Sequence, residues 1–485
     1  MRRDVPGPPG WPRDFAWAVL AAVTGGLALR ALCFHAYADG WDSCEYVWAV
    51  DGGYLPHSPY ILYLWLGRLV SLVLPTDVGL SAVSLLSGIA AIGVSALLVR
   101  KQTGSSLAGG LAGAAYAVFP CAVWFSGIQE VYALAGALGL ASMLAAWSAG
   151  TIPAAVAGAL FGAALATHTG MFFLLPAFIV AVATQANPSM RWRRLATAGL
   201  AGMVVPMAAV IWVAAVLPGP DRGGPGLTAY LVGIAPIPSA PEGFGLLASL
   251  GRTLQGAAAE TMRPGAPTLV LAACTALAWL RGARVAAFWL VYASPYLVYE
   301  TVIGWNVDPG VHVVFAGPAF AAMLGCGVAS LESWRPRILR GVTLAAVLMA
   351  LIPAVLHSVQ ASGPVLSRAS FLESEPVATL RALRSEAPPN AVVVQPPGVD
   401  NVNLVPAYAG RRPVILQEGR YLLFEGLPGS PLNLGSFSLL TSQTLERLMR
   451  EGIPVLSLVP DPFPVGQVGM RWHPTGRIYA LRRGD

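Results

Sequence analysis

The stretch FAWAVLAAVTGGLALRALCF, residues 15–34, decides the fold class of this sequence. Its twenty residues have the length that an α-helix needs to cross the hydrocarbon layer of a membrane. The run is too long for the core of a signal peptide and lacks a clear cleavage site. We therefore expect it to be retained as the first membrane span.

The composition extends this interpretation to the whole chain of 485 residues. Hydrophobic residues make up 55% of it and charged residues only 11%, whereas a soluble domain carries roughly a quarter charged residues. A water-soluble globular enzyme is excluded. The sequence instead predicts a polytopic α-helical membrane protein.

Apolar runs predict about eleven spans, and the placement of Arg and Lys predicts their orientation. The expected spans are residues 15–34, 79–99, 107–126, 131–148, 152–167, 169–185, 195–217, 267–281, 285–303, 312–330 and 338–357. With the N-terminus in the cytoplasm, every inner connection except the tight one near Gly150 carries cationic residues, as the positive-inside rule requires. The C-terminus is then expected on the outer side.

Three outer segments are too long to be simple turns: residues 35–78, residues 218–266, and the C-terminus from residue 358. We expect residues 1–357 to form the transmembrane domain and residues 358–485 a small extracytoplasmic α/β domain. Its predicted helices cover 375–386 and 441–451, and its predicted strands cover 391–395, 453–459 and 477–481.

The first outer segment holds the most informative residues. Asp42 and Glu45 are three residues apart, so on a helix they share one face. A Pro-rich turn follows, and then the apolar run 61–74, which has Arg68 in its middle and predicts a helix along the membrane surface. Paired carboxylates at the lipid–water boundary suit reactions on lipid-borne substrates. A solvated loop whose acids cap helices is the alternative that spacing leaves open.

Four further ionisable residues are expected on the same membrane face: Glu130, His168, Asp308 and His312. Each alone could be an interface anchor, because ionisable residues at span ends are tolerated. His168 starts a span, and free N–H groups at a helix N-terminus favour an anion such as phosphate. A divalent cation among these acids and histidines stays open, because no ligand pair has diagnostic spacing.

Two absences exclude other functions. The sequence has no phosphate-cradling loop of the Gly-x4-Gly-Lys-Ser/Thr type, which argues against an ATP-driven pump. Charged residues are nearly absent from the middle of the predicted spans, which argues against an ion-coupled transporter. Scattered glycines in the spans are expected to let helices approach closely.

The order of these features resembles the membrane glycosyltransferases of the C-type superfold, which take sugars from polyprenyl-phosphate carriers. The bacterial family related to protein O-mannosyltransferases typically reads Asp-Ser-Gly-Glu-Phe and then Pro-His-Pro-Pro-Gly-Tyr-Pro. The corresponding stretches here are Asp42-Ser43-Cys44-Glu45-Tyr46, Pro56-His57-Ser58-Pro59-Tyr60, Glu130-Val131-Tyr132-Ala133-Leu134, and His168-Thr169-Gly170 through Leu174-Leu175-Pro176.

A second similar branch is the aminoarabinose transferases of lipid A, which share the Asp-x-x-Glu pattern and usually have Lys near the position of His168. The resemblance covers roughly residues 10–330. Cys44 stands where the first family has Gly, and Ser58 where it has Pro. These departures concern the geometry of the acceptor more than the catalytic acid.

The resemblance implies roles for individual residues. Asp42 would be the catalytic base, with Glu45 as its catalytic neighbour, and His168 and His312 would hold the leaving phosphate. Glu130 and Glu45 would bind hydroxyl groups, or a divalent cation if there is one. The other implied substrate-binding residues are His57, Tyr60, Tyr132 and Asp308.

The implied activity is transfer of a hexosyl or pentosyl group from a polyprenyl-phosphate-linked donor to an acceptor hydroxyl, with inversion, on the outer face of the cytoplasmic (inner) membrane. The acceptor is a protein, a lipid or a glycan, and no nucleic acid is involved. Two alternatives are a transporter or flippase for a lipid-linked glycan and a degenerate transferase fold kept as a scaffold. Polar residues along a mid-bilayer path would favour the flippase, and an outer cavity without a base would favour the scaffold.

Overall fold

A computed structural model describes most of the chain. The described residues are 13–185, 188–217, 227, 230, 245–261, 266–302, 309–332, 337–361, 367–375, 377–395, 403–417, 420–426, 432, 437–460, 462, 470–475 and 478–483. They divide into two compact units. We call them the bundle unit (Met1–Phe34, Ala82–Ala209 and Ile234–Val365) and the sheet unit (His35–Ser81, Val210–Gly233 and Leu366–Asp485).

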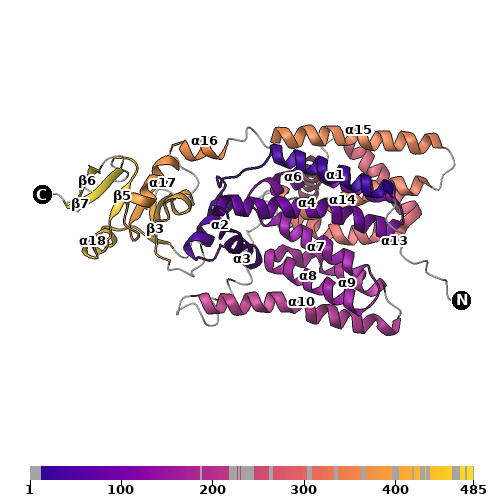
Figure 1. Ribbon diagram of the computed structural model, residues 1–485, viewed down its shortest axis with the longest axis horizontal. Coiled ribbons are helices and arrows are strands. Elements are labelled where there is room, and N and C mark those ends of the chain that lie inside the picture. Colours follow the sequence, from indigo (N-terminus) through magenta and orange to yellow (C-terminus); the bar gives the residue numbers. More distant parts are fainter. Residues whose placement is uncertain are drawn as a thin grey trace. The chain divides into compact units, whose positions relative to one another are not determined.

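The bundle unit is built from helices (Figure 1). Its elements are α1 (Arg13–Leu32), most of α4 (Thr76–Thr103), α5 (Ser106–Val118), α6 (Pro120–Gly127), α7 (Tyr132–Ala146), α8 (Thr151–Thr167), η1 (Thr169–Leu174), α9 (Leu175–Thr184), most of α10 (Pro188–Val216), α12 (Leu246–Thr261), α13 (Ala266–Val302), α14 (Pro309–Glu332) and α15 (Arg337–Ala361).

Among the described residues, five helical segments are long and apolar enough to cross a membrane: Arg13–Leu32, Thr76–Thr103, Pro188–Val216, Val314–Leu331 and Gly341–Gln360. The pair α5 and α6 makes a sixth if it counts as one bent span. The predicted spans 131–148, 152–167, 169–185 and 267–281 correspond to shorter apolar helices. A helical membrane protein is thus supported, and the count of eleven stays a prediction.

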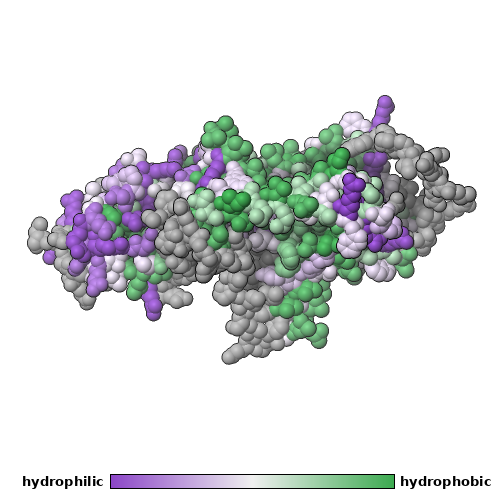
Figure 2. Space-filling view, turned by 90° about the horizontal axis from the view of Figure 1, so that it is seen from below, coloured by the Kyte–Doolittle hydropathy of each residue, from purple (hydrophilic) through white to green (hydrophobic). Residues whose placement is uncertain are grey.

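On the face seen in Figure 2, apolar side chains gather over the described helices of the bundle unit, as expected for helices that face lipid. Leu200 is 76% exposed, and Leu269 is also largely exposed. A contiguous apolar surface of this kind on a soluble protein would be an aggregation site. It is what a lipid-facing bundle presents.

Glycines allow close helix packing, as the sequence predicted. A Cβ at Gly158 in α8 would overlap the backbone carbonyl of Ala198 in α10, and one at Gly162 would overlap that of Gly202. Because neither glycine has a side chain, the two backbones approach each other directly.

The run predicted as one span over 107–126 bends by 59° between α5 and α6. Pro120 has no N–H and its ring disfavours a helical conformation at the preceding residue. Phe119 is accordingly extended, at φ −64° and ψ 127°. Arg30 is fully buried beside this break and donates hydrogen bonds to Ala117 O at 2.8 Å and Ala122 O at 3.2 Å. The guanidinium thus satisfies carbonyls near the break.

The helices of the sheet unit are α2 (Trp41–Gly52), α3 (Ile61–Val70), α16 (Arg368–Glu373), α17 (Val377–Glu386), η3 (Val405–Ala409), a π-type turn, and α18 (Ser442–Arg450). Its strands are β1 (Val392–Val394), β2 (Arg412–Gln417), β3 (Arg420–Phe424), β4 (Phe437–Leu439), β5 (Val455–Ser457), β6 (Met470–Thr475) and β7 (Ile478–Arg483). The described residues between 377 and 483 therefore contain both the helices and the strands predicted there.

The seven strands form one sheet in the order β4-β3-β2-β1-β5-β7-β6. The central strand β1 pairs parallel with β2 and with β5, with Val393 opposite Pro413 and Leu456, and the other pairs are antiparallel. Leu445 and Leu448 of α18 pack with Val392 and Val394 in the core of the sheet. The position of this part outside the cytoplasm, and its boundary at residue 358, stay predictions.

The first predicted outer segment belongs to the sheet unit rather than to the bundle unit. Trp48 of α2 packs edge-on against Phe424 of β3, with ring centroids 4.8 Å apart. The backbone N–H of Leu432 donates to Leu55 O at 2.8 Å. The helix that bears Asp42 and Glu45 is therefore supported directly by the C-terminal sheet.

Helix α3 begins at Ile61 as predicted, but its last helical residue is Val70 and turns follow to Leu74. Arg68 lies over the ring of Trp212 at 5.1 Å, and Trp65 meets Trp212 edge-on with centroids 5.8 Å apart. Leu69 is 62% exposed. An Arg and two Trp beside an exposed apolar residue are typical of a membrane interface, and the lie of α3 along the membrane stays a prediction.

Candidate active site

Asp42 and Glu45 lie on the first turns of α2, as the sequence predicted. The helix begins after Gly40, whose extended backbone at φ −75° and ψ 161° provides the N-cap. The spacing of three residues puts both carboxylates on one side of the helix. Asp42 is half-buried and Glu45 is buried, 4% exposed. The alternative of a solvated loop is therefore wrong for Glu45.

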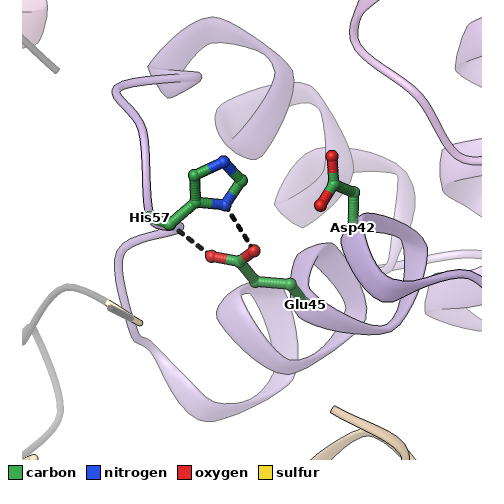
Figure 3. A group of neighbouring side chains, drawn as sticks. All are labelled: Asp42, Glu45 and His57. Carbon is green, nitrogen blue, oxygen red and sulfur yellow. Dashed lines mark hydrogen bonds and ion pairs between the residues drawn. The ribbon is translucent and has the colours of Figure 1, made fainter. Parts of the chain in front are cut away.

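His57 binds Glu45 through both carboxylate oxygens (Figure 3). Its Nδ1 lies 2.6 Å from Glu45 Oε2, and its backbone N–H donates to Glu45 Oε1. The residues between them form the end of α2 and a turn that reverses the chain at Gly53, whose φ of +73° suits a residue without a side chain. Glu45 thereby anchors the Pro-rich turn onto α2.

The three groups perturb one another. Burial alone would lower the pKa of His57, but the hydrogen bond and the charge of Glu45, together with the charge of Asp42, raise that pKa to about 9. At neutral pH the imidazole is therefore a cation paired with Glu45. Burial raises the pKa of Asp42 above its ordinary value, and the nearby His57 opposes part of this rise. A carboxylate with a raised pKa is a stronger base.

Aromatic rings enclose the turn. Tyr60 is buried and meets the His57 ring edge-on, with centroids 5.6 Å apart, and it also meets Tyr46 at 5.7 Å. The hydroxyl of Tyr230 donates to Ser58 O at 3.3 Å. Burial, with smaller contributions from Glu45 and Tyr60, raises the pKa of Tyr230 well above its ordinary value. Tyr230 thus remains a neutral phenol beside the pair.

Sequence reasoning did not identify Tyr230. It comes from the predicted second outer segment, which is rich in Pro and Gly and has no pattern that distinguishes one Tyr from another. The only available signal is its type, because a buried Tyr usually keeps its hydroxyl on a hydrogen-bond acceptor.

A second group of predicted residues lies in the bundle unit. Tyr132 and His168 are in contact, with ring centroids 5.1 Å apart, and both pack against Phe315 at 5.7 and 5.3 Å. Glu130 is buried just before Tyr132, and its backbone N–H donates to Ser84 Oγ at 3.2 Å. The structure thus brings Tyr132 and His168 together although they are 36 residues apart in the sequence. Phe315, on α14, was not predicted.

His168 caps a helix, although not as the sequence predicted. Its Nδ1 accepts the backbone N–H of Gly170 at 3.0 Å, at the start of the short 3-10 helix η1. One of the N–H groups expected to face an anion is therefore occupied by the imidazole itself. The bond places the proton of the neutral ring on Nε2, so this nitrogen is the hydrogen-bond donor of the imidazole.

Asp308 lies outside the described residues, and so does the side chain of His312, although its backbone is part of α14. Their predicted places at the site, and the convergence of the Asp42 and His168 groups on one cavity, stay predictions.

Asp42, Glu45 and His57 offer one potential metal-ligand atom each, all within 4.8 Å of one another. Carboxylate oxygens and an imidazole nitrogen can bind a divalent cation. In this arrangement, however, Glu45 Oε2 and His57 Nδ1 bind each other at 2.6 Å. An ion would have to replace that hydrogen bond, so the cluster fits a cation only in part.

None of the known family models matches this sequence, and no curated protein is similar to it in sequence. The fold, however, matches solved structures. The aminoarabinose transferase ArnT from Cupriavidus metallidurans, bound to undecaprenyl phosphate, is 13% identical with a TM-score of 0.66, and the match covers 96% of this chain and 98% of ArnT. Its apo state matches with the same TM-score.

The oligosaccharyltransferase of Archaeoglobus fulgidus is also similar. Its apo form matches with a TM-score of 0.54 and 12% identity, over 82% of this chain and 64% of that one. The form named AglB, in complex with an inhibitory peptide and a dolichol-phosphate, matches over 92% and 70% at the same TM-score. This chain therefore has the C-type glycosyltransferase fold that its motifs predicted. Identities of 12–13% show the fold and leave the reaction to the site.

Proposed function

We propose that this protein is a membrane glycosyltransferase that moves a sugar from a polyprenyl-phosphate carrier to an acceptor hydroxyl, on the outer face of the cytoplasmic membrane. The observation that carries the proposal is Asp42, a half-buried carboxylate with a raised pKa beside a closed Glu45–His57 pair. The likeness to transferase structures that contain undecaprenyl phosphate and dolichol-phosphate supports the class of donor.

Asp42 is the proposed general base. The pKa of an acceptor hydroxyl lies far above that of a carboxylate, so Asp42 takes the proton late, as the bond from the acceptor oxygen to the anomeric carbon forms. The bond from that carbon to the phosphate oxygen breaks in the same step, and its electrons leave with the polyprenyl phosphate. General-base assistance of this kind typically contributes 10²–10⁴-fold to the rate.

Glu45 is proposed to act through His57 rather than as a second base, because both of its oxygens accept hydrogen bonds from that residue. The pairing keeps His57 protonated, and the side chain of His57 is 37% exposed. A cation in this place favours the ionised form of Asp42 and can bind a phosphate or a hydroxyl of the substrate. Tyr60 orients the imidazole by edge-on packing.

The leaving phosphate is proposed to be held by Nε2–H of His168, and by His312. A dianionic leaving group needs its charge stabilised more than it needs a proton, and fixed donors supply that stabilisation. Glu130, Tyr132 and Asp308 are proposed to bind hydroxyl groups of the sugar or the acceptor.

Attack opposite to the phosphate would invert the anomeric centre. Nucleotide sugars are not available outside the cytoplasm, so a transferase there needs a lipid-linked donor. The proposed topology follows from this: about eleven spans, a cytoplasmic N-terminus, and residues 358–485 outside.

The test uses a host strain that lacks the gene, complemented with the wild type or with Asp42→Asn. Lipids, glycans and glycoproteins of both strains are compared by mass analysis. We expect a glycosylated product with the wild type only, at equal amounts of membrane-inserted protein. The same product in the Asp42→Asn strain would refute the proposed role of Asp42. The anomeric configuration of the product, determined by NMR, tests inversion.

A further inference from the structure

A cavity of about 510 Å³ lies within the sheet unit, lined by residues of α2, the start of α4, α16, α17 and η3. Small-molecule sites typically measure about 300–1,000 Å³. The cavity is therefore large enough for a sugar with a charged substituent.

The cavity is separate from the candidate active site. Val47 and Asp51 of α2 line it and are four residues apart, so they share one face of the helix. At about 100° for each residue, this face is roughly opposite to Asp42 and Glu45. The two sides of one helix thus serve two different sites.

Three arginines line the cavity: Arg368 from α16, and Arg381 and Arg384 from one face of α17. Asp77 accepts two hydrogen bonds from Arg368, both at 3.1 Å. Asp51 lies 3.3 Å from Arg384. Three guanidinium groups against these two carboxylates leave a net positive charge in the lining. A planar guanidinium matches the oxygens of a phosphate in pairs.

Arg381 and Arg384 have N–H donors that can bind a ligand. Arg381 is exposed, and the hydrogen bond that we find for its guanidinium is a long one of 3.4 Å to Leu372 O. Arg384 is 53% exposed, and its ion pair with Asp51 leaves further N–H donors. The two side chains are three residues apart on α17 and so can contact one anion together.

The lining also contains groups that recognise hydroxyls. Asp51 is 28% exposed and accepts from Thr76 Oγ1 at 2.5 Å. Ser71 and Ser385 contribute hydroxyls to the same cavity. Carboxylates and hydroxyls beside an arginine pair suit a ligand that carries both hydroxyls and a phosphate.

We propose that this cavity binds a phosphorylated saccharide, with its phosphate on Arg381 and Arg384 and its hydroxyls toward Asp51 and Thr76. The proposal does not depend on the transferase reaction, because the cavity lies on the other face of α2. If these charged residues only held α2 and α17 together, the cavity would bind no such ligand.

The full chain in phosphatidylcholine nanodiscs is titrated with glucose 1-phosphate by calorimetry. We expect saturable binding that weakens as salt is added, because the contacts are partly exposed charges. Glucose should not bind, and inorganic phosphate should bind at least tenfold more weakly. No binding of glucose 1-phosphate, or equal binding of inorganic phosphate, overturns the proposal.

Arg381→Gln should weaken binding of glucose 1-phosphate roughly tenfold or more, since a hydrogen bond to a charged group is lost. Arg420→Gln is the matched control, because it removes the same charge from an exposed position on β3. Equal losses in both variants would contradict the assignment. The glucose 1-phosphate titration is repeated in nanodiscs that contain phosphatidylinositol 4-phosphate. Weaker binding of glucose 1-phosphate there would support a lipid headgroup as the ligand. Unchanged binding would support a soluble sugar phosphate.

Discussion

Glu45 Oε2 lies 2.6 Å from Nδ1 of His57, and the other oxygen of the same carboxylate accepts the backbone N–H of His57. One side chain on α2 thus fixes both the ring and the backbone of a residue twelve positions later. Neither of these bonds involves Asp42, which is the proposed base.

Glu45→Gln should lower the pKa of His57 from about 9 toward its ordinary value of 6.5. Burial, which lowers this pKa, is then no longer offset by the negative charge of residue 45. The measurement is an NMR titration of the imidazole in protein labelled at its six histidines, assigned with His57→Gln. Glu425→Gln, which removes an ion pair with Arg447 elsewhere in the sheet unit, should leave the titration unchanged.

The stability of the protein should fall as the pH rises from 6.5 through about 9. The pKa of His57 is higher in the folded protein than in the unfolded chain, so its contribution is complete below the unfolded value and is lost through the folded one. The ring is 37% exposed, so solvent screening limits the effect to about 1 kcal/mol. Thermal unfolding at pH 6 and at pH 10 measures it. His57→Gln should show a smaller decline, and a decline equal to that of the wild type would count against the pair.

His168→Asn should separate two roles of this residue. Asn caps helix N-termini well, so it can keep the acceptor for the Gly170 N–H while it removes the Nε2–H donor. We expect a folded protein whose rate of sugar transfer falls about 100–1,000-fold, because the donor that stabilises the charge of the leaving phosphate is lost. Transfer from a lipid-linked sugar in liposomes measures this loss. Full activity in His168→Asn would exclude the imidazole from the phosphate site.

Arg30→Gln should destabilise the bundle unit by about 2–4 kcal/mol, because carbonyls beside the α5–α6 break lose their donor in an apolar surrounding. Thermal unfolding in detergent measures the change. Arg191→Gln is the control, since Arg191 is an exposed cation on α10. If the two variants unfold at the same temperature, Arg30 does not stabilise the break.

Local features were predictable from the sequence because they depend on short-range rules. The length rule located the helices, and spacing placed Asp42 and Glu45 on one helical face. The predicted helix 441–451 and strand 391–395 match α18 and β1 closely. Strands β2, β3, β4 and β6 were not predicted, because their apolar runs are short and are bounded by polar, charged or Pro residues.

Long-range partners were not predictable. Glu45 contacts His57 because of the backbone path of residues 53–60. Hydrophobic periodicity does not predict the path of such a Pro-rich turn. Tyr230 reaches the same turn from 172 residues away. Pro120 is a local signal for the break in the predicted span 107–126. The break was not predicted because the hydropathy of this stretch is continuous. The superfold was predicted correctly because its motif order is itself a long-range pattern, whereas the span count stays a prediction.

The most direct test of the account is the rate of sugar transfer by Asp42→Asn compared with Asp39→Asn. Asp39 is the matched control, a carboxylate three residues earlier that is 45% exposed. Both proteins are purified in liposomes and supplied with a polyprenyl-phosphate-linked sugar and an acceptor found by the mass analysis. Their thermal unfolding is measured in parallel, and Asp42→Asn should unfold at the same temperature as the wild type or higher, because burial disfavours the charge.

We expect the transfer rate of Asp42→Asn to fall at least about 100-fold, as expected for removal of a general base, while that of Asp39→Asn stays near the wild type. Transfer by folded Asp42→Asn at the wild-type rate would contradict the role of Asp42 as the catalytic base.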